Sequence, residues 1–156
     1  WIDKYPNLVV VQTFSKAQGL AGLRLGMAFA HPEIIGLMNK VKAPYNINVL
    51  TQKEVMRRLE EQGLIQQQVH QIKQEKEQLL LEFKSIAFIE KVFPSDANFF
   101  LVKMDDSKRR YNELIDRGIV VRDSSKNLNC ANTLRITVGT PDENNALIIA
   151  LRSMDK

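Results

Sequence analysis

The sequence has almost no cysteine, since Cys130 is the only one in 156 residues. A lone cysteine cannot form a disulfide within the chain, which excludes a small disulfide-stapled fold and is consistent with a reducing compartment such as the cytoplasm. Its neighbours Asn129, Ala131 and Asn132 include no base or cation that would activate the thiol. We therefore expect Cys130 to be unreactive.

Long hydrophobic runs and a strong net charge are also missing. No apolar stretch approaches the ~18 residues that a membrane helix requires, and no signal peptide is visible, so we expect no membrane association. The formal net charge is only +4. Acidic neighbours dilute the densest basic cluster, Lys108-Arg109-Arg110, which we interpret as a solvated face and not as a nucleic-acid site. No cluster of metal ligands is present either.

The chain does contain one informative stretch, Thr13–Gly26, with the sequence TFSKAQGLAGLRLG. It follows an apolar run, residues 8–11, which predicts a short buried strand. The small and apolar residues around Lys16 predict a sequestered amine, because burying an ammonium without a partner is costly. A neutral lysine amine is a competent nucleophile toward carbonyl groups.

The same stretch contains the donors that a phosphate group prefers. Thr13 and Ser15 supply hydroxyl groups, and Arg24 supplies a fixed fork of N–H donors. A reactive amine next to phosphate-binding residues favours a cofactor with both an aldehyde and a phosphate. Pyridoxal 5′-phosphate is the obvious candidate.

These residues resemble a known family. Ser15–Gly26 is similar to the lysine signature of class I and II aminotransferases of fold type I, and the wider sequence is most similar to the histidinol-phosphate branch. The resemblance implies an α/β fold: the end of the large domain, followed by a small C-terminal α+β domain. It also implies that Lys16 binds the cofactor aldehyde covalently, and that Thr13, Ser15 and Arg24 hold the cofactor phosphate.

Two arginines interrupt otherwise apolar strand patterns, Arg122 after Ile119-Val120-Val121 and Arg135 between Leu134 and Ile136. An arginine inside a strand usually needs an anion. That anion could be an internal partner, and the sequence offers three candidates: Asp123, Asp142 and Glu143.

The family resemblance assigns these arginines to the substrate. The segment Leu134–Asn144 is similar to the family's C-terminal motif and implies that Arg135 grips the substrate carboxylate or, in the histidinol-phosphate branch, its phosphate. Arg122, within Gly118–Asp123, is implied to contribute to the same pocket. Asn98, within Asp96–Phe99, is implied to line it.

We expect three segments: residues 1–45 as the end of the large domain, 46–86 as connecting helices, and 87–156 as the small domain. Hydrophobic periodicity and turn residues predict strands at 8–13, 23–30, 99–104, 119–122 and 133–139, and helices at 48–62, 64–86 and 106–118. Further helices are expected to begin at Pro32, with His31 as a capping or surface residue, and at Pro141, capped by Thr140.

The resemblance implies a cytoplasmic, homodimeric aminotransferase that uses an amino donor and a 2-oxo acid acceptor. Another class I or II enzyme, such as an aromatic aminotransferase, and a cofactor-binding sensing domain of a transcription regulator remain alternatives. The chain begins with Trp1 instead of methionine, and we expect it to be the C-terminal part of a longer enzyme. Other cofactor-binding residues of the family normally lie upstream, so we expect this chain alone to be inactive and to bind cofactor weakly.

Overall fold

The computed structural model describes residues 1–155, which form two compact units. The first comprises residues 1–67, and the second begins at Gln68. The boundary lies within the long helix α3 (Gln62–Phe83). None of the helices in the described range combines the length and apolar character needed to cross a bilayer. The predicted segment ends at residues 45 and 86 remain predictions about the complete protein.

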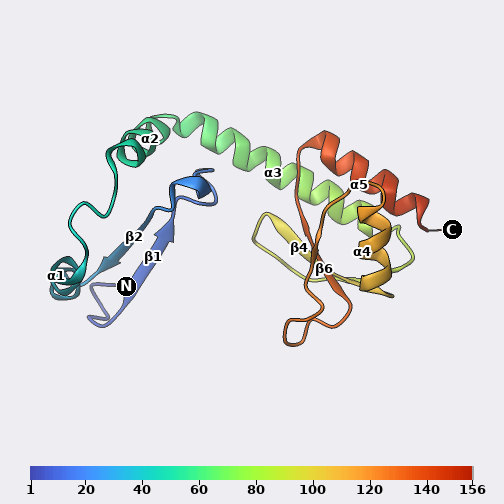
Figure 1. Ribbon diagram of the computed structural model, residues 1–156, viewed down its shortest axis with the longest axis horizontal. Helices are drawn as coiled ribbons and strands as arrows, with labels where there is room; N and C mark the ends of the chain where they lie inside the picture. Colours follow the sequence, from blue (N-terminus) through green and yellow to red (C-terminus); the bar gives the residue numbers. More distant parts are fainter. Residues whose placement is uncertain (156) are drawn as a thin grey trace. The chain divides into compact units, whose positions relative to one another are not determined.

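The first unit contains an antiparallel hairpin of β1 (Val9–Thr13) and β2 (Gly26–Ala30), shown in Figure 1. Both predicted strands are confirmed, but β2 is shorter than expected because Ala21–Leu23 form a 3₁₀ turn. The prediction that the first strand is buried is wrong, since Val11 is 75% exposed. A two-stranded sheet alone has no second layer that could cover its apolar side chains.

Two helices complete the first unit, α1 (Pro32–Val41) and α2 (Val49–Glu60). Side chains cap both: His31 accepts a hydrogen bond from the first turn of α1, as predicted, and Asn48 does the same for α2. The sequence predicts that the helix at 48–62 ends at Gly63, a residue that often stops helices, and this prediction is wrong. The chain leaves the helical conformation for a single residue after α2, and Gly63 lies inside α3.

The second unit is built on a four-stranded antiparallel sheet with the order β3-β4-β6-β5. Its strands are β3 (Ile89–Val92), β4 (Phe99–Met104), β5 (Arg122–Asp123) and β6 (Thr133–Thr137). The two central strands lie where the sequence predicts them. In contrast, β5 is two residues long and begins where the predicted strand was expected to end.

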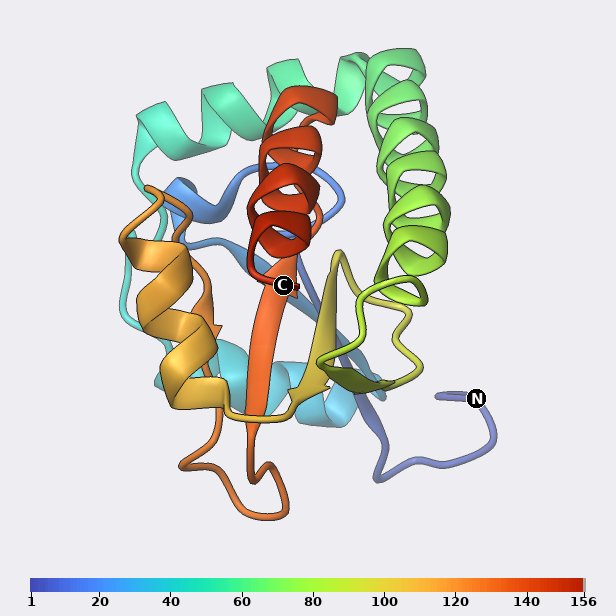
Figure 2. The same ribbon diagram turned by 90° about the vertical axis from the view of Figure 1, so that its right-hand side faces the viewer.

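Helices cover one face of this sheet: the second half of α3, α4 (Ser107–Ile115) and α5 (Pro141–Ser153) (Figure 2). The predicted Thr140 cap of α5 is confirmed and forms a reciprocal capping box with Glu143. Side chains from these helices and from β4 and β6 form the core, including Leu79, Phe83, Phe100, Val102, Met104, Leu114, Leu134, Ile136 and Leu151. The chain is thus an α/β protein whose C-terminal part is an α+β unit.

The other sheet face is determined by strand alternation. Phe100, Val102 and Met104 of β4 are buried in the core, so the residues between them lie on the opposite face. Arg135 lies between the core residues Leu134 and Ile136 of β6 and shares that opposite face.

Candidate functional site

The two hydroxyl groups predicted to bind phosphate lie together at the end of β1. The oxygens of Thr13 and Ser15 are 2.8 Å apart, and the Ser15 backbone N–H donates to Thr13 Oγ1 at 3.1 Å. This local turn, closed by the Ser15 amide, places two hydroxyls in one small region, and hydroxyl groups are donors that suit phosphate oxygens.

The chain after Thr13 closes into a tight loop. The Phe14 N–H donates to the Leu25 carbonyl at 3.2 Å, and the Leu20 N–H donates to the Phe14 carbonyl at 2.9 Å. A further bond of 2.8 Å runs from the Gly19 N–H to the Lys16 carbonyl, with Gly19 at a φ of +70°, a conformation that glycine adopts without strain. These hydrogen bonds fix the backbone of the loop and place Lys16 at the start of the turn that Gly19 closes.

Lys16 itself is exposed, so the prediction of a sequestered amine is wrong for the chain as described. Within residues 13–26, only the Phe14 side chain is buried. The loop joins two strands of a hairpin that has no second layer, and small residues cannot bury a long lysine side chain by themselves. The local sequence therefore shapes the backbone around Lys16 but does not desolvate its amine.

Arg24 adopts a left-handed conformation, with a φ of 52°, at the end of the 3₁₀ turn. Its Nη1 donates to the Ala21 carbonyl at 2.9 Å. Within residues 1–155, no hydrogen bond joins Arg24 to Thr13, Ser15 or Lys16, although the remaining guanidinium donors are available to an anion. The structure thus brings the two hydroxyls together and leaves the grouping of Arg24 and Lys16 with them as a prediction.

The sequence analysis missed Arg58, which contacts this loop from α2. Its Nε donates to the Gln18 carbonyl at 2.9 Å, and its Nη1 lies 3.0 Å from Glu61 Oε2. A Cβ added to Gly19 would lie 3.7 Å from Arg58 Nη2. The available signal is positional: Arg58 is one turn after the buried Val55 and lies on the buried face of α2.

Arg122 and Arg135 are brought together in the second unit, because they are direct partners in the pairing of β5 with β6. Directly paired residues project from the same face of a sheet, so two guanidinium groups lie on one face. Like charges at such positions are destabilising. Among residues 1–155, neither arginine forms an ion pair with a carboxylate, and Arg135 Nε is buried without a hydrogen-bond partner.

Two of the internal partners that the sequence offered, Asp123 and Glu143, have other roles. A hydrogen bond from the Ser125 side chain, with one from the Ser125 N–H at 2.8 Å, holds the pKa of the Asp123 carboxyl below its usual value. Glu143 accepts from the Thr140 N–H at 2.7 Å in the capping box. An external anion is therefore the better explanation of the arginine pair.

An aromatic ring and a backbone contact position the surroundings of Arg135. The guanidinium carbon lies 4.9 Å from the centroid of the Phe99 ring. Asn98, the residue before Phe99, is exposed, and its carbonyl accepts a hydrogen bond from the Val138 N–H at 2.9 Å. Asn98 is thus fixed at one end of the β4–β6 pair that contains Arg135.

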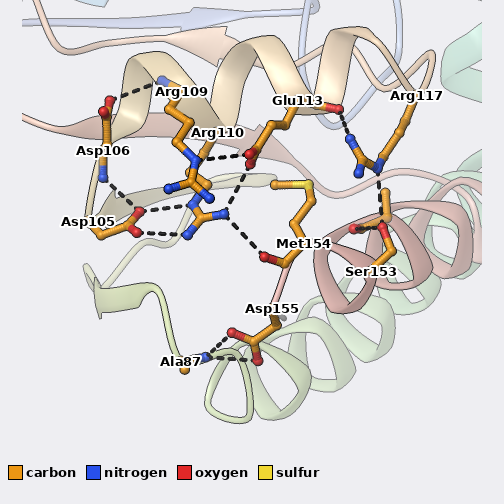
Figure 3. Close-up of polar contacts among 11 residues, drawn as sticks. Ala87, Asp105, Asp106, Arg109, Arg110, Glu113, Arg117, Ser153, Met154 and Asp155 are labelled. Atoms are coloured by element: carbon orange, nitrogen blue, oxygen red, sulfur yellow. Dashed lines mark hydrogen bonds and ion pairs between the residues drawn. The ribbon is translucent and has the colours of Figure 1, made fainter.

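The densest charged network has a structural role. Arg110, expected on a solvated face, is instead 5% exposed: it forms a bidentate pair with Asp105 and contacts Glu113 and the Met154 carbonyl (Figure 3). Its guanidinium carbon also lies 3.8 Å from the centroid of the Phe88 ring. Hydrogen bonds from Arg110 lower the pKa of Asp105. Partial burial opposes the same change in Glu113, but hydrogen bonds from two arginines still lower its pKa. Because Arg110 bonds to Asp105 before α4, to Glu113 within α4 and to Met154 at the end of α5, we assign this cluster a structural role.

Comparison with known proteins is consistent with these features. The family described as aminotransferase class I and II matches residues 1–151. A histidinol-phosphate aminotransferase of Flavobacterium johnsoniae is 46% identical over 154 residues, which are 99% of this chain and 44% of that protein. The chain therefore spans less than half the length of the curated relatives it matches.

Solved structures show the same fold. The crystal structure of a histidinol-phosphate aminotransferase from Clostridium acetobutylicum matches 99% of this chain and 47% of its own, with a TM-score of 0.91 at 23% identity. That of a histidinol-phosphate aminotransferase from Sinorhizobium meliloti, in complex with pyridoxal 5′-phosphate, covers 96% of this chain and 42% of its own, with a TM-score of 0.82 at 22% identity.

Proposed function

Because the chain belongs to the class I and II aminotransferase family, we propose that the complete protein is a pyridoxal-phosphate-dependent aminotransferase. We further propose that it transfers the amino group of histidinol phosphate to 2-oxoglutarate. The observation that supports this most directly is the pair of hydroxyls at Thr13 and Ser15, placed immediately before Lys16 on a closed loop. The curated relative at 46% identity supports the choice of substrate.

The residues of the first unit fit the cofactor's chemistry. The hydroxyls of Thr13 and Ser15 would hold its phosphate, and Arg24 would add a charged donor. Lys16 would supply the amine that attaches to its aldehyde. Once bound, pyridoxal phosphate supplies an electron sink that stabilises negative charge on the substrate carbon.

The chain's own contributions to the reaction are positioning and proton transfer. Lys16 Nζ would be the base that removes the proton from the substrate carbon and delivers it to the aldehyde carbon of the cofactor. For that role the amine must lose the exposure that it has here, which requires packing from the rest of the protein. Arg122 and Arg135 hold the substrate's anionic group by charge-assisted hydrogen bonds and so fix the opposite end of the substrate.

The resemblance also supports a cytoplasmic homodimer, which we include in the proposal. The single cysteine, half-buried and free, is consistent with a reducing compartment. Sedimentation of the complete protein would test the dimer.

The activity is tested with the complete protein, histidinol phosphate and 2-oxoglutarate. We expect Lys16→Ala to abolish turnover, because no other residue replaces both the attachment and the base, whereas Lys42→Ala, an exposed control, should retain it. Substantial turnover by the Lys16 variant would contradict the assignment. Turnover of aromatic amino acids, with no turnover of histidinol phosphate, would instead support an aromatic aminotransferase. Cofactor binding without any turnover would support the sensing domain.

A further inference from the structure

The amphipathic pattern of α3 is interrupted by Lys76, and the structure gives this half-buried lysine defined partners. Its Nζ donates to the carbonyl oxygens of Ser95 and Ala97, the latter at 2.7 Å. It also lies 5.3 Å from the centroid of the Phe100 ring. An ammonium group has three donors, and two of them close a single turn of the chain.

That turn leads directly into Asn98 and Phe99. The Ser95 hydroxyl donates to the Phe99 carbonyl at 2.7 Å and accepts from the Ala97 N–H at 3.2 Å. The turn is thus held by its own serine on one side and by Lys76 on the other. Its geometry determines where β4 begins.

The residue before Lys76 holds the chain segment that leaves β6. Asn144, 5% exposed, donates from Nδ2 to Glu75 Oε2 at 2.8 Å and to the Gly139 carbonyl at 3.1 Å, while its Oδ1 accepts from the Gly139 N–H at 2.9 Å. The Val138 N–H, next to Gly139, bonds to the Asn98 carbonyl at 2.9 Å. Two consecutive residues of α3 therefore hold both segments at this end of the sheet.

We propose that Lys76, supported by Glu75, is a positioning residue for the substrate-anion site of Asn98 and Arg135, which rests on the function proposed above. Arg135 Nε has no hydrogen-bond partner within residues 1–155, so contact with Phe99 is what orients the guanidinium. Phe99 in turn follows the turn that Lys76 closes. A looser turn at residues 95–97 would let the Phe99 ring move, and the Arg135 guanidinium would lose its fixed orientation.

The test uses the complete, cofactor-loaded protein, with inorganic phosphate as the probe and calorimetry as the measurement. Cofactor saturation keeps the probe out of the cofactor's own phosphate site. Lys76→Met retains the length of the side chain but removes its donors, and Lys76→Arg retains the charge. Lys73→Met, about one turn earlier on an exposed position of α3, is the matched control.

We expect Lys76→Met to weaken phosphate binding about tenfold, Lys76→Arg to recover most of the loss, and Lys73→Met to change it less than about twofold. Phosphate affinity is the readout of positioning, and hydrogen exchange separates a local change at the turn from a general loss of stability. The Val138 amide should exchange faster in Lys76→Met, while the core amides of Leu134 and Ile136 keep their protection.

Equal phosphate affinity in folded Lys76→Met and Lys73→Met would overturn the positioning role. If Lys76→Met loses the protection of the core, Ser95→Ala provides the same test from the other side of the turn. Faster exchange at Val138 in that variant with unchanged affinity would also overturn it. Phosphate binding that is absent, or unchanged by Arg135→Ala, would refute the proposed anion site and this inference with it.

Discussion

At the scale of single residues, some charged side chains have partners within the protein, whereas others are placed to bind an external anion. Arg110 is nearly fully buried, and its guanidinium bonds to Asp105, Glu113 and the Met154 carbonyl. Arg122 and Arg135 face one another across two strands without a carboxylate in residues 1–155. The first arrangement stabilises the fold, whereas the second stores electrostatic repulsion that a bound anion would relieve.

Replacing Arg110 should therefore be costly. We expect Arg110→Met to lower the free energy of unfolding by about 2–4 kcal/mol, because it leaves Asp105 and Glu113 without their shared partner. Arg109→Met should cost less than about 1 kcal/mol, since Arg109 is exposed and, within residues 1–155, pairs with Glu113 alone. Urea unfolding followed by fluorescence measures both. Similar midpoints for the two variants would contradict the structural role of Arg110.

The cluster around Arg110 also predicts that folding stability falls at acidic pH. The pKa values of Asp105 and Glu113 are lowered in the folded state, so the unfolded chain binds more protons as the pH falls. Their contribution to stability is complete above the unfolded values of about 4 and disappears as the pH drops through the lower folded values. Urea midpoints measured between about pH 6 and 3 should fall less steeply for Asp105→Asn. Parallel curves would show that Asp105 has no such role.

The sequence identifies which polar groups require a partner, but it does not show which distant segment supplies that partner. The sequence identifies the two strand arginines because they interrupt apolar patterns, and it identifies Thr13 and Ser15 because their hydroxyls lie beside a lysine that follows a strand. Arg110 was misassigned because its neighbours in sequence are charged, while its ring contact and one of its acceptors come from Phe88 and Met154. The exposure of Lys16 and the contact from Arg58 likewise depend on packing between distant segments.

At the scale of elements, capping residues are the most reliable guides. The caps at His31, Asn48 and Thr140 lie where the sequence places helix starts, because a capping side chain acts on amides within its own turn. The end of α2 was not predictable in the same way. Gly63 can end a helix, but the helical conformation is already interrupted at Glu61, and a new helix begins at Gln62.

The capping box of α5 gives a prediction at this scale. Thr140 Oγ1 accepts from the Glu143 N–H at 3.3 Å, and the Thr140 N–H bonds to Glu143 Oε2. We expect Thr140→Ala to destabilise the protein by about 1 kcal/mol, whereas Thr140→Ser should be close to neutral because it keeps the hydroxyl. Thermal unfolding of the three proteins compares them. A melting temperature of Thr140→Ala equal to that of the parent would argue against the cap.

At the scale of the whole molecule, the two units differ in how far they are self-sufficient. The large hydrophobic cluster lies entirely in the second unit, from Leu79 onward. In the first unit, the buried apolar side chains are Phe14, Val55 and Ile65. Since the chain spans less than half of its curated relatives, the first unit is the part whose packing depends most on the remainder of the protein.

That difference predicts weak cofactor binding by this chain alone. Lys16 is exposed and Arg24 bonds to its own turn, so the preorganisation that gives affinity is incomplete. Titration with pyridoxal phosphate, followed by absorbance, should give no more reaction with the parent chain than with Lys16→Ala, which reports the exposed lysines in general. Saturable binding that Lys16→Ala eliminates would contradict this expectation.

Strand alternation in β4 and β6 has an evolutionary consequence. Even-numbered positions such as Phe100, Val102 and Ile136 form the core, while the odd-numbered Phe99 and Arg135 lie on the face opposite it. Substitutions at the odd-numbered positions can therefore change which ligand is bound with little loss of folding stability. Such a sheet lets ligand preference diverge between descendants that share a common scaffold.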